Sequence, residues 1–586
     1  MAAAAPNDHD ELQPADPGAT SIAGPLPTVV ALRVIGQDPA IADETGKILT
    51  ANASVPWAPL TPGPTNSRFQ VVDFDASTGV LQPPADLPSD SDLFATATDE
   101  ELLTDVRFHA QQVYAVAART LAAFETALGR RLPWAFAGHQ LYLVPHAFSE
   151  ANAYYSADDR ALLFGYVPQP GDHAIYTCLS HDVVAHETTH AVLDGLRRRF
   201  LGPGLPDQAA FHEGFADVVA LLSVFSLRPV VAACLGPADA DGRIDRRLVT
   251  AERLRGNVLT SVGEQLGIAL TGGHGALRRS AMEPPPPNWV SLSAYREPHK
   301  RGEVLVSVML DVLIDIWVTR LQPLLSPGSE RLPGRIDRAR AAEEGAKAAG
   351  HLLNMAIRGL DYLPPVEFEF GDFVQAAVLA DREVAPDDGM AYRAKLVDGF
   401  AAAGIDVPSG TAANLAERNV RLRYENLNFS AMRTDPDEVF RFLWQNADQL
   451  GVDTSLYTHV EAVRPSQRVG PDGLVVVESV ANYVQLDELT VAEFEARSGR
   501  PLPAGIEPGT RLQVFGGGTL VFDQFGRAKL HVVKRLDDWD RQHRRIEYLH
   551  QAGLYDTRLR LGFSYPSARG QAFADLHGGG SDGEAW

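Results

Sequence analysis

The segment HDVVAHETTHAVLDG, from His181 to Gly195, constrains the fold of this chain more than any other. It places three histidines, two aspartates and a glutamate among valines, alanines and threonines, in a region whose apolar spacing predicts a buried helix. Burying ionisable side chains is costly unless they are paired with one another or bind a metal. We therefore expect this helix to fold around a polar site.

Two histidines of this segment have the spacing of metal ligands. His186 and His190 are four residues apart, so both imidazoles project from one face of a helix, one turn apart. Nitrogens placed in this way can both bind one zinc ion, at roughly 2.0–2.1 Å. Glu187 then lies beside the metal as the expected general base, which is the H-E-x-x-H arrangement. The alternative reading of these five residues alone is a helix with two hydrogen-bonded histidines and an exposed acid.

A second acidic pair follows in AAFHEGFADVVALL. Glu213 begins an apolar helix and is the candidate third zinc ligand, because a catalytic zinc needs three protein ligands and one open position. Asp217, four residues on, faces the same side and is expected to accept the other N–H of a zinc-bound histidine. Without a metal, this largely apolar helix would carry two buried carboxylates with no partner, and burying such charges costs free energy.

Together these motifs resemble the thermolysin-type zinc metallopeptidases, the gluzincins. DVVAHETTHAVLDG is similar to that family's zinc helix, and HEGFADVVAL is similar to its second zinc helix. The linker between them is a few residues longer than usual for the family, which favours a loop insertion at Gly202–Pro206. SEANAYYSADD resembles the family's edge strand, whose main chain pairs with extended substrate. The resemblance implies substrate binding by Asn152 and Ala153; an ordinary hairpin rich in aromatic residues is the alternative.

Two further stretches extend the resemblance over roughly residues 100–405. REPHKRGEVLVSVML resembles the place where the family carries a histidine that donates to the oxyanion, which implies this role for His299, oriented by Glu297. The helical block that ends in Gly404 and Ile405 resembles the closing half of these enzymes. The resemblance implies one Zn²⁺, and because no acidic cluster after Asp217 matches the family's calcium sites, we expect no structural calcium.

The sequence also departs from the family. No tyrosine lies between Ala191 and His212 to assist the oxyanion, and Tyr295 is a candidate substitute. Arg296 and Arg301 are candidates for the substrate-binding arginine by proximity alone. The long pro-domain of secreted members is not found, so an intracellular type of peptidase is expected.

Composition narrows the partners and the location. The net charge of −23 over 586 residues argues against a nucleic-acid partner, since such proteins carry a basic face. The most apolar segment, Glu303 to Val318, is short for a membrane span and carries two aspartates, so no membrane partner is expected. The N-terminal residues lack the features of a secretory signal, and two cysteines imply no disulfide framework. We expect a cytoplasmic protein, with signal-independent export left open.

The chain is too long for one core, and we predict an α+β fold with several domains. A thermolysin-like core is expected, with an N-terminal mixed α/β subdomain and a mainly helical C-terminal subdomain, followed by a separate α+β accessory domain. The predicted sequence of parts is a disordered tail (1–25), the N-terminal catalytic subdomain (26–250), the helical catalytic subdomain (251–405), the accessory domain (406–575) and a flexible tail (576–586). From about Asp99, the stretch DEELLTDVRFHAQQVYAVAARTLAAFETALGRRL is predicted to be strongly helical, and buried helices are predicted over 211–236 and 303–320.

The function predicted from these features is zinc-dependent hydrolysis of a peptide bond in a peptide or protein substrate. Two alternatives remain: a peptidase that acts from the N-terminus of short peptides, and a zinc-bearing scaffold with an idle or blocked site whose C-terminal domain binds a protein partner. A purely structural zinc site has no need of Glu187, which favours an enzyme. Cys178 is interpreted as a buried structural cysteine, and His181 and His212 as residues with supporting or exposed roles beside the site.

Overall fold

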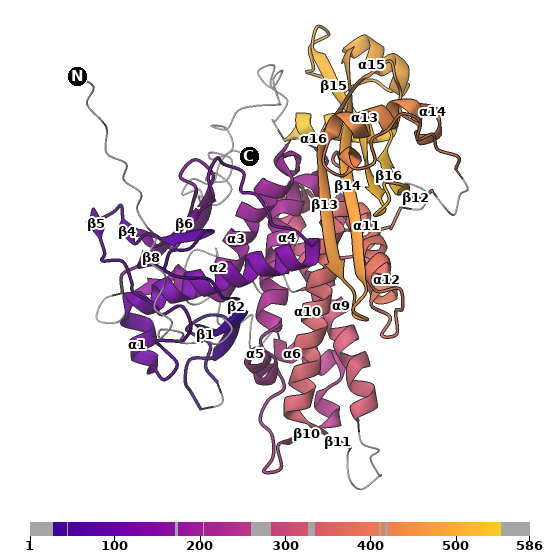
Figure 1. Ribbon diagram of the computed structural model, residues 1–586. Coiled ribbons are helices and arrows are strands. Elements are labelled where there is room, and N and C mark those ends of the chain that lie inside the picture. Colours follow the sequence, from indigo (N-terminus) through magenta and orange to yellow (C-terminus); the bar gives the residue numbers. More distant parts are fainter. Residues whose placement is uncertain are drawn as a thin grey trace, which may run out of the picture.

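The computed structural model describes residues 27–43, 45–169, 174–202, 204–258, 283–325, 334–408, 412–415 and 420–552. Helices and strands are mixed throughout this part of the chain, so the α+β class is confirmed (Figure 1). The tails expected at 1–25 and 576–586 lie outside the described residues.

The N-terminal part is built on small sheets. A two-stranded antiparallel sheet pairs β1 (Val29–Ile35) with β2 (Thr50–Pro56). A mixed sheet follows with the strand order β3-β6-β8-β7, in which β3, β6 and β8 are parallel, β7 is the antiparallel outer strand, and β9 pairs with β8. The bounds are β3 (Phe69–Val71), β4 (Phe74–Asp75), β5 (Val80–Leu81), β6 (Leu141–Phe148), β7 (Ala153–Ser156), β8 (Ala161–Val167) and β9 (Ile175–Tyr176).

The stretch predicted to be helical from Asp99 is helical, but it is divided into two helices at Asp105. α1 (Asp99–Thr104) starts at a capping box between Thr98 and Glu101 and ends at Asp105. α2 (Val106–Leu128) starts at that same Asp105, whose carboxylate accepts the backbone N–H of Arg107. An extended Asp105 therefore ends one helix and begins the next, and α2 then crosses the molecule as a largely buried helix.

A block of helices carries the centre of the molecule (Figure 1). Its members are α3 (His181–Leu196), α4 (Pro206–Phe225), α5 (Arg228–Cys234), α6 (Ala251–Val258), α9 (Pro298–Leu321), α10 (Arg338–Tyr362), α11 (Phe370–Val384) and α12 (Tyr392–Ala402), with a short pairing of β10 (Arg243–Asp245) and β11 (Arg335–Asp337). The single helix predicted over 211–236 is wrong: α4 ends at Phe225, and α5 starts anew with Pro229 in its first turn, where a missing N–H costs nothing.

Apolar side chains of these helices form the main core. Among the described residues, no single helix is long and apolar enough to cross a membrane, and one bent pair, α4 with α5 at 87°, meets that test on length and composition.

The C-terminal part folds around a five-stranded antiparallel sheet of order β12-β16-β15-β14-β13. Its elements are β12 (Ala412–Asn414), α13 (Pro436–Gln445), α14 (Ala447–Leu450), β13 (Tyr457–Val469), β14 (Val475–Thr490), α15 (Val491–Ser498), β15 (Arg511–Phe522), β16 (Ala528–Lys534) and α16 (Trp539–Gln551). Two apolar clusters of its own lie within this part, while Val480, Val521, Leu530 and Val532 pack into the main core.

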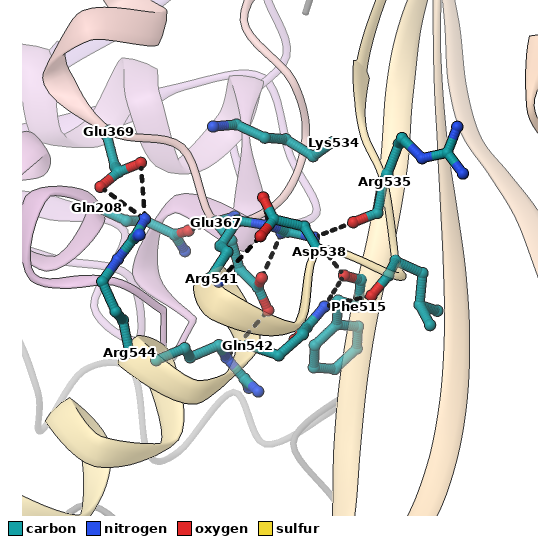
Figure 2. Close-up of polar contacts among 12 residues, drawn as sticks. Gln208, Glu367, Glu369, Phe515, Lys534, Arg535, Asp538, Arg541, Gln542 and Arg544 are labelled. Carbon is teal, nitrogen blue, oxygen red and sulfur yellow. Dashed lines mark hydrogen bonds and ion pairs between the residues drawn. The ribbon is translucent and has the colours of Figure 1, made fainter. Parts of the chain in front are cut away.

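Ion pairs and hydrogen bonds of buried charged residues join this sheet and helix α16 to the helical block (Figure 2). Arg541 of α16 hydrogen-bonds to the carboxylate of Glu367, and Arg545 lies 3.2 Å from the same carboxylate. The Glu367 backbone N–H donates to the side chain of Gln208 on α4, at 2.8 Å. The C-terminal part is therefore continuous with the helices that carry the histidine motif.

Candidate metal centre

Helix α3 presents His186 and His190 to a common point. Both side chains are buried, and their Nε2 atoms lie 2.9 Å apart with the ring planes at 88°. The intervening Thr188 and Thr189 donate their hydroxyls to carbonyl oxygens four residues back in the helix, at 2.7 and 2.8 Å. The hydroxyls of the two threonines thus have their hydrogen-bond acceptors within the helix. The two imidazoles instead point away from the helix axis, toward the common point.

Glu213 approaches the same point from helix α4. Its Oε2 lies 3.5 Å from Nε2 of His186 and 3.6 Å from Nε2 of His190, and the three residues are arranged as a group that can hold a metal ion. The backbone next to Glu213 is held against helix α9, because a Cβ on Gly214 would stand 2.8 Å from the carbonyl oxygen of Gly302. Glycine at both positions permits this close approach of α4 and α9.

Asp217 fixes the orientation of His186. Its Oδ1 lies 2.8 Å from Nδ1 of His186, so the imidazole donates from Nδ1 and its Nε2 lone pair faces Glu213. Burial alone would lower the pKa of His186, but the nearby carboxylate of Asp217, helped by Glu213, outweighs it and raises that pKa well above its ordinary value in the metal-free protein. A bound cation would take the place of the proton.

His212 orients the ring of His190 in the same way. The two Nδ1 atoms are 2.7 Å apart, and the rings stack with centroids 4.8 Å apart and planes at 11°. Burial lowers the pKa of His212 well below its ordinary value, with the neighbouring His190 adding to the effect. A neutral His212 can accept the Nδ1–H of His190, which leaves the Nε2 lone pair of His190 directed at the metal point. The position of His212, directly before Glu213, is the sequence signal for this role.

Glu187 lies against the same cluster with one oxygen uncommitted. It is buried, and burial raises its pKa to about 8, while His186 opposes and Glu213 adds to the rise. The backbone N–H of Tyr155 donates to this carboxylate. Oε2 of Glu187 has no hydrogen-bond partner among the described residues. Such a buried acceptor costs free energy unless a donor reaches it, and a water bound at a metal would supply that donor.

His299 stands at the open side of the cluster, in the first turn of α9. Its Nε2 lies 3.7 Å from Oε2 of Glu213, and its Nδ1 lies 2.8 Å from Oε1 of Glu297. Glu297 also caps α9 by accepting the backbone N–H groups of His299 and Lys300. The His299 side chain is 28% exposed, against 8% for His186 and 3% for Glu213, so His299 is more exposed than these two ligand candidates.

The segment expected to bind substrate forms the outer edge of the mixed sheet. The carbonyl of Asn152 accepts the backbone N–H of Gly165 at 2.8 Å, and Ala153 is the first residue of β7. In an antiparallel pair the backbone groups of successive residues point to opposite sides, so those of Ala153 face away from β8. Tyr155, two residues on, points its N–H the same way, and that N–H reaches Glu187. The outer side of β7 therefore borders the cluster.

Arg301 and Tyr295, the candidates for the family's substrate-binding arginine and oxyanion tyrosine, make contacts away from the cluster. Arg301 pairs with Asp207 of α4 at 2.5 Å, donates to the carbonyl of Tyr295 at 3.1 Å and lies over the ring of Trp289. The Tyr295 side chain is buried against Trp289. No contact of Arg296 or Tyr295 with the histidine cluster is found among the described residues.

Comparison with known proteins adds no relative. No family model matches this sequence, and no curated protein matches it. The meaning of the cluster therefore depends on its own donor atoms, their supports and their surroundings.

Proposed function

We propose that this protein is a zinc-dependent peptidase with a thermolysin-like catalytic core. The observation that carries the proposal is the convergence of His186, His190 and Glu213, with the unpartnered Oε2 of Glu187 buried beside them. Two imidazoles and one carboxylate are the ligand set of a catalytic zinc that keeps a position open. Each histidine nitrogen facing the site is freed by a partner on the far side of its ring.

The residues around the site can each be given a chemical task. When bound, zinc supplies a Lewis acid that polarises a carbonyl and lowers the pKa of water. Glu187, buried against the cluster, would accept the proton of the attacking water and pass it to the leaving amine. His299, held by Glu297, donates a hydrogen bond to the oxyanion that forms on the substrate carbonyl.

The outer edge of β7 suggests how a peptide would be held. An extended substrate can add as a strand to the outward backbone at Ala153 once the N–H of Ala153 releases Oδ1 of Asn152, to which it donates at 2.8 Å, and this brings the substrate main chain beside Glu187. Recognition of this kind uses the peptide backbone, so the proposed substrate class is an extended peptide or an unfolded segment of a protein. A zinc-bearing scaffold with an idle site is the competing function, and it gives the free oxygen of Glu187 no role.

Hydrolysis of an unbiased peptide library tests the proposal. Wild-type protein loaded with zinc is compared with Glu187→Gln and with a matched control, Glu252→Gln, which alters an exposed glutamate of α6. We expect cleavage by the wild type and the control, and none by Glu187→Gln although it retains zinc. Equal zinc in all three proteins with no cleavage by any of them would refute the peptidase and favour the scaffold.

A further inference from the structure

A second group of metal-ligating side chains lies outside the catalytic cluster. His109 of α2, His146 of β6 and Cys178 present their donor atoms within 4.8 Å of one another. Cys178 belongs to the short 3₁₀ turn Thr177–Leu179, directly before helix α3. All three are buried, with exposed fractions of 1%, 8% and 0%. Three elements far apart in the sequence thus meet at one point.

The outer nitrogens of both histidines are committed as donors. Nε2 of His109 lies 3.1 Å from the backbone carbonyl oxygen of Leu103, and Nδ1 of His146 lies 2.9 and 3.0 Å from the two carboxylate oxygens of Asp73. Neither acceptor can give a proton, so each outer nitrogen carries one. In neutral rings, the inner nitrogens are then both lone pairs.

Those inner nitrogens nevertheless face each other. Nδ1 of His109 and Nε2 of His146 are 2.8 Å apart, nearly the 2.9 Å between the Nε2 atoms of His186 and His190. Two lone pairs at this distance repel unless a cation lies between them. A single proton would satisfy the two rings but would leave the Cys178 thiol, which points into the same space, with no part in the arrangement.

We propose that His109, His146 and Cys178 bind a second zinc ion, which would link the elements that carry them. Two imidazoles and one thiolate form a donor set that favours zinc and comparable transition metals over magnesium or calcium. The carboxylate of Asp73 and the carbonyl of Leu103 orient the two rings, as the outer partners of metal-bound histidines do. This site differs from the His186 cluster in containing sulfur, and it does not depend on the proposed peptidase activity.

The surroundings fit a site that holds the fold together. The ring of Tyr176 packs on both imidazoles, with centroids 4.6 Å from that of His109 and 4.9 Å from that of His146. A metal here would join α2, the sheet strand β6 and the turn that leads into α3. Because α3 carries the catalytic motif, the second zinc would fix where that helix begins.

Metal content and cobalt absorption test this site directly. Wild-type protein should bind two zinc ions per chain, and Cys178→Ser and Glu213→Gln should each bind one. Cobalt(II) bound to a thiolate gives an intense near-ultraviolet charge-transfer absorption that a site of imidazoles and carboxylate lacks. We expect this absorption in the wild type and in Glu213→Gln, and its loss in Cys178→Ser. Cys234→Ser is the matched control, since Cys234 is the other buried cysteine and should leave the absorption unchanged.

The result does not depend on whether Cys178→Ser folds, because the wild type and Cys234→Ser give the decisive spectra. Asp73→Asn adds a milder change and should weaken zinc binding at this site about 10–100-fold. One zinc per wild-type chain, lost in Glu213→Gln, with no thiolate absorption from cobalt, would overturn the second site and leave the peptidase proposal standing. Two metals and the thiolate absorption without peptide cleavage would support the second site and count against the peptidase.

Discussion

Replacing Asp217 with asparagine should weaken zinc binding by an amount that depends on pH. The carboxylate of Asp217 lies 2.8 Å from Nδ1 of His186, and asparagine can still accept that hydrogen bond but without the charge. Loss of such an outer partner typically costs 10–100-fold in metal affinity, which corresponds to about 1.4–2.7 kcal/mol. The affinity of Asp217→Asn for zinc should therefore fall by that factor at a pH where His186 carries no extra proton.

The same carboxylate also strengthens the competing proton. Because Asp217 raises the pKa of His186 in the metal-free protein, zinc must displace a proton from the wild type more often than from the variant. This extra competition is present below the raised pKa and disappears as pH rises through it. The dissociation constant of Asp217→Asn for zinc, divided by that of the wild type, should consequently grow as pH rises from about 6 to 9.

A chelator competition assay measures both effects. Zinc dissociation constants are determined for the wild type, Asp217→Asn and Asp315→Asn, the last being an exposed aspartate of α9 that serves as control. The sulfur-containing site is distinguished by repeating the titration with Cys178→Ser. Dissociation constants for Asp217→Asn and the wild type that agree within twofold across this pH range would refute the assignment of Asp217 as the partner of a zinc ligand.

Three further changes have expected outcomes. His299→Ala should lower kcat about 10²–10³-fold with unchanged zinc content, and an unchanged kcat would remove His299 from the oxyanion site. Asp361→Asn should lower the free energy of unfolding in urea by about 3–5 kcal/mol, because this fully buried carboxylate binds both terminal nitrogens of Arg130 at 2.6 and 2.7 Å; a loss below about 1 kcal/mol would contradict this. Burial lowers the pKa of His531 from 6.5 to about 4, so the unfolded chain binds the proton first. The free energy of unfolding should fall as pH drops from 6.5 to 4, by about 3 kcal/mol more in the wild type than in His531→Gln. An equal pH dependence of the unfolding free energy in urea for the two proteins would exclude this contribution.

The catalytic cluster could be predicted because its signals are local. Four-residue spacing on a helix places His186 beside His190, and the same spacing places Glu213 and Asp217 on one side of the next helix. These relations hold whatever the rest of the chain does, provided that both segments are helical. The contact between His212 and His190 exists only because α4 packs on α3. The sequence therefore indicated His212 as a supporting residue but not which histidine it supports.

The second cluster had no such local signal. His109, His146 and Cys178 lie on a helix, a strand and a turn, and only tertiary packing brings them together. The docking of the C-terminal sheet was likewise hidden, because nothing in the sequence of a strand says which helices its face will cover. Pairing of Arg541 with Glu367 is an example, since both residues look like ordinary surface charges in the sequence (Figure 2).

The central claim is that zinc and Glu187 together hydrolyse peptide bonds, and a zinc titration of metal-free protein tests it most directly. Cleavage of a susceptible peptide is followed in the wild type and in Glu187→Gln while bound zinc is measured in the same samples. The account predicts that wild-type activity rises as the His186 site fills, and that Glu187→Gln binds the same zinc with activity lower by about 10²–10⁴-fold. Equal activity in the two proteins, or none in either at full zinc occupancy, would contradict it.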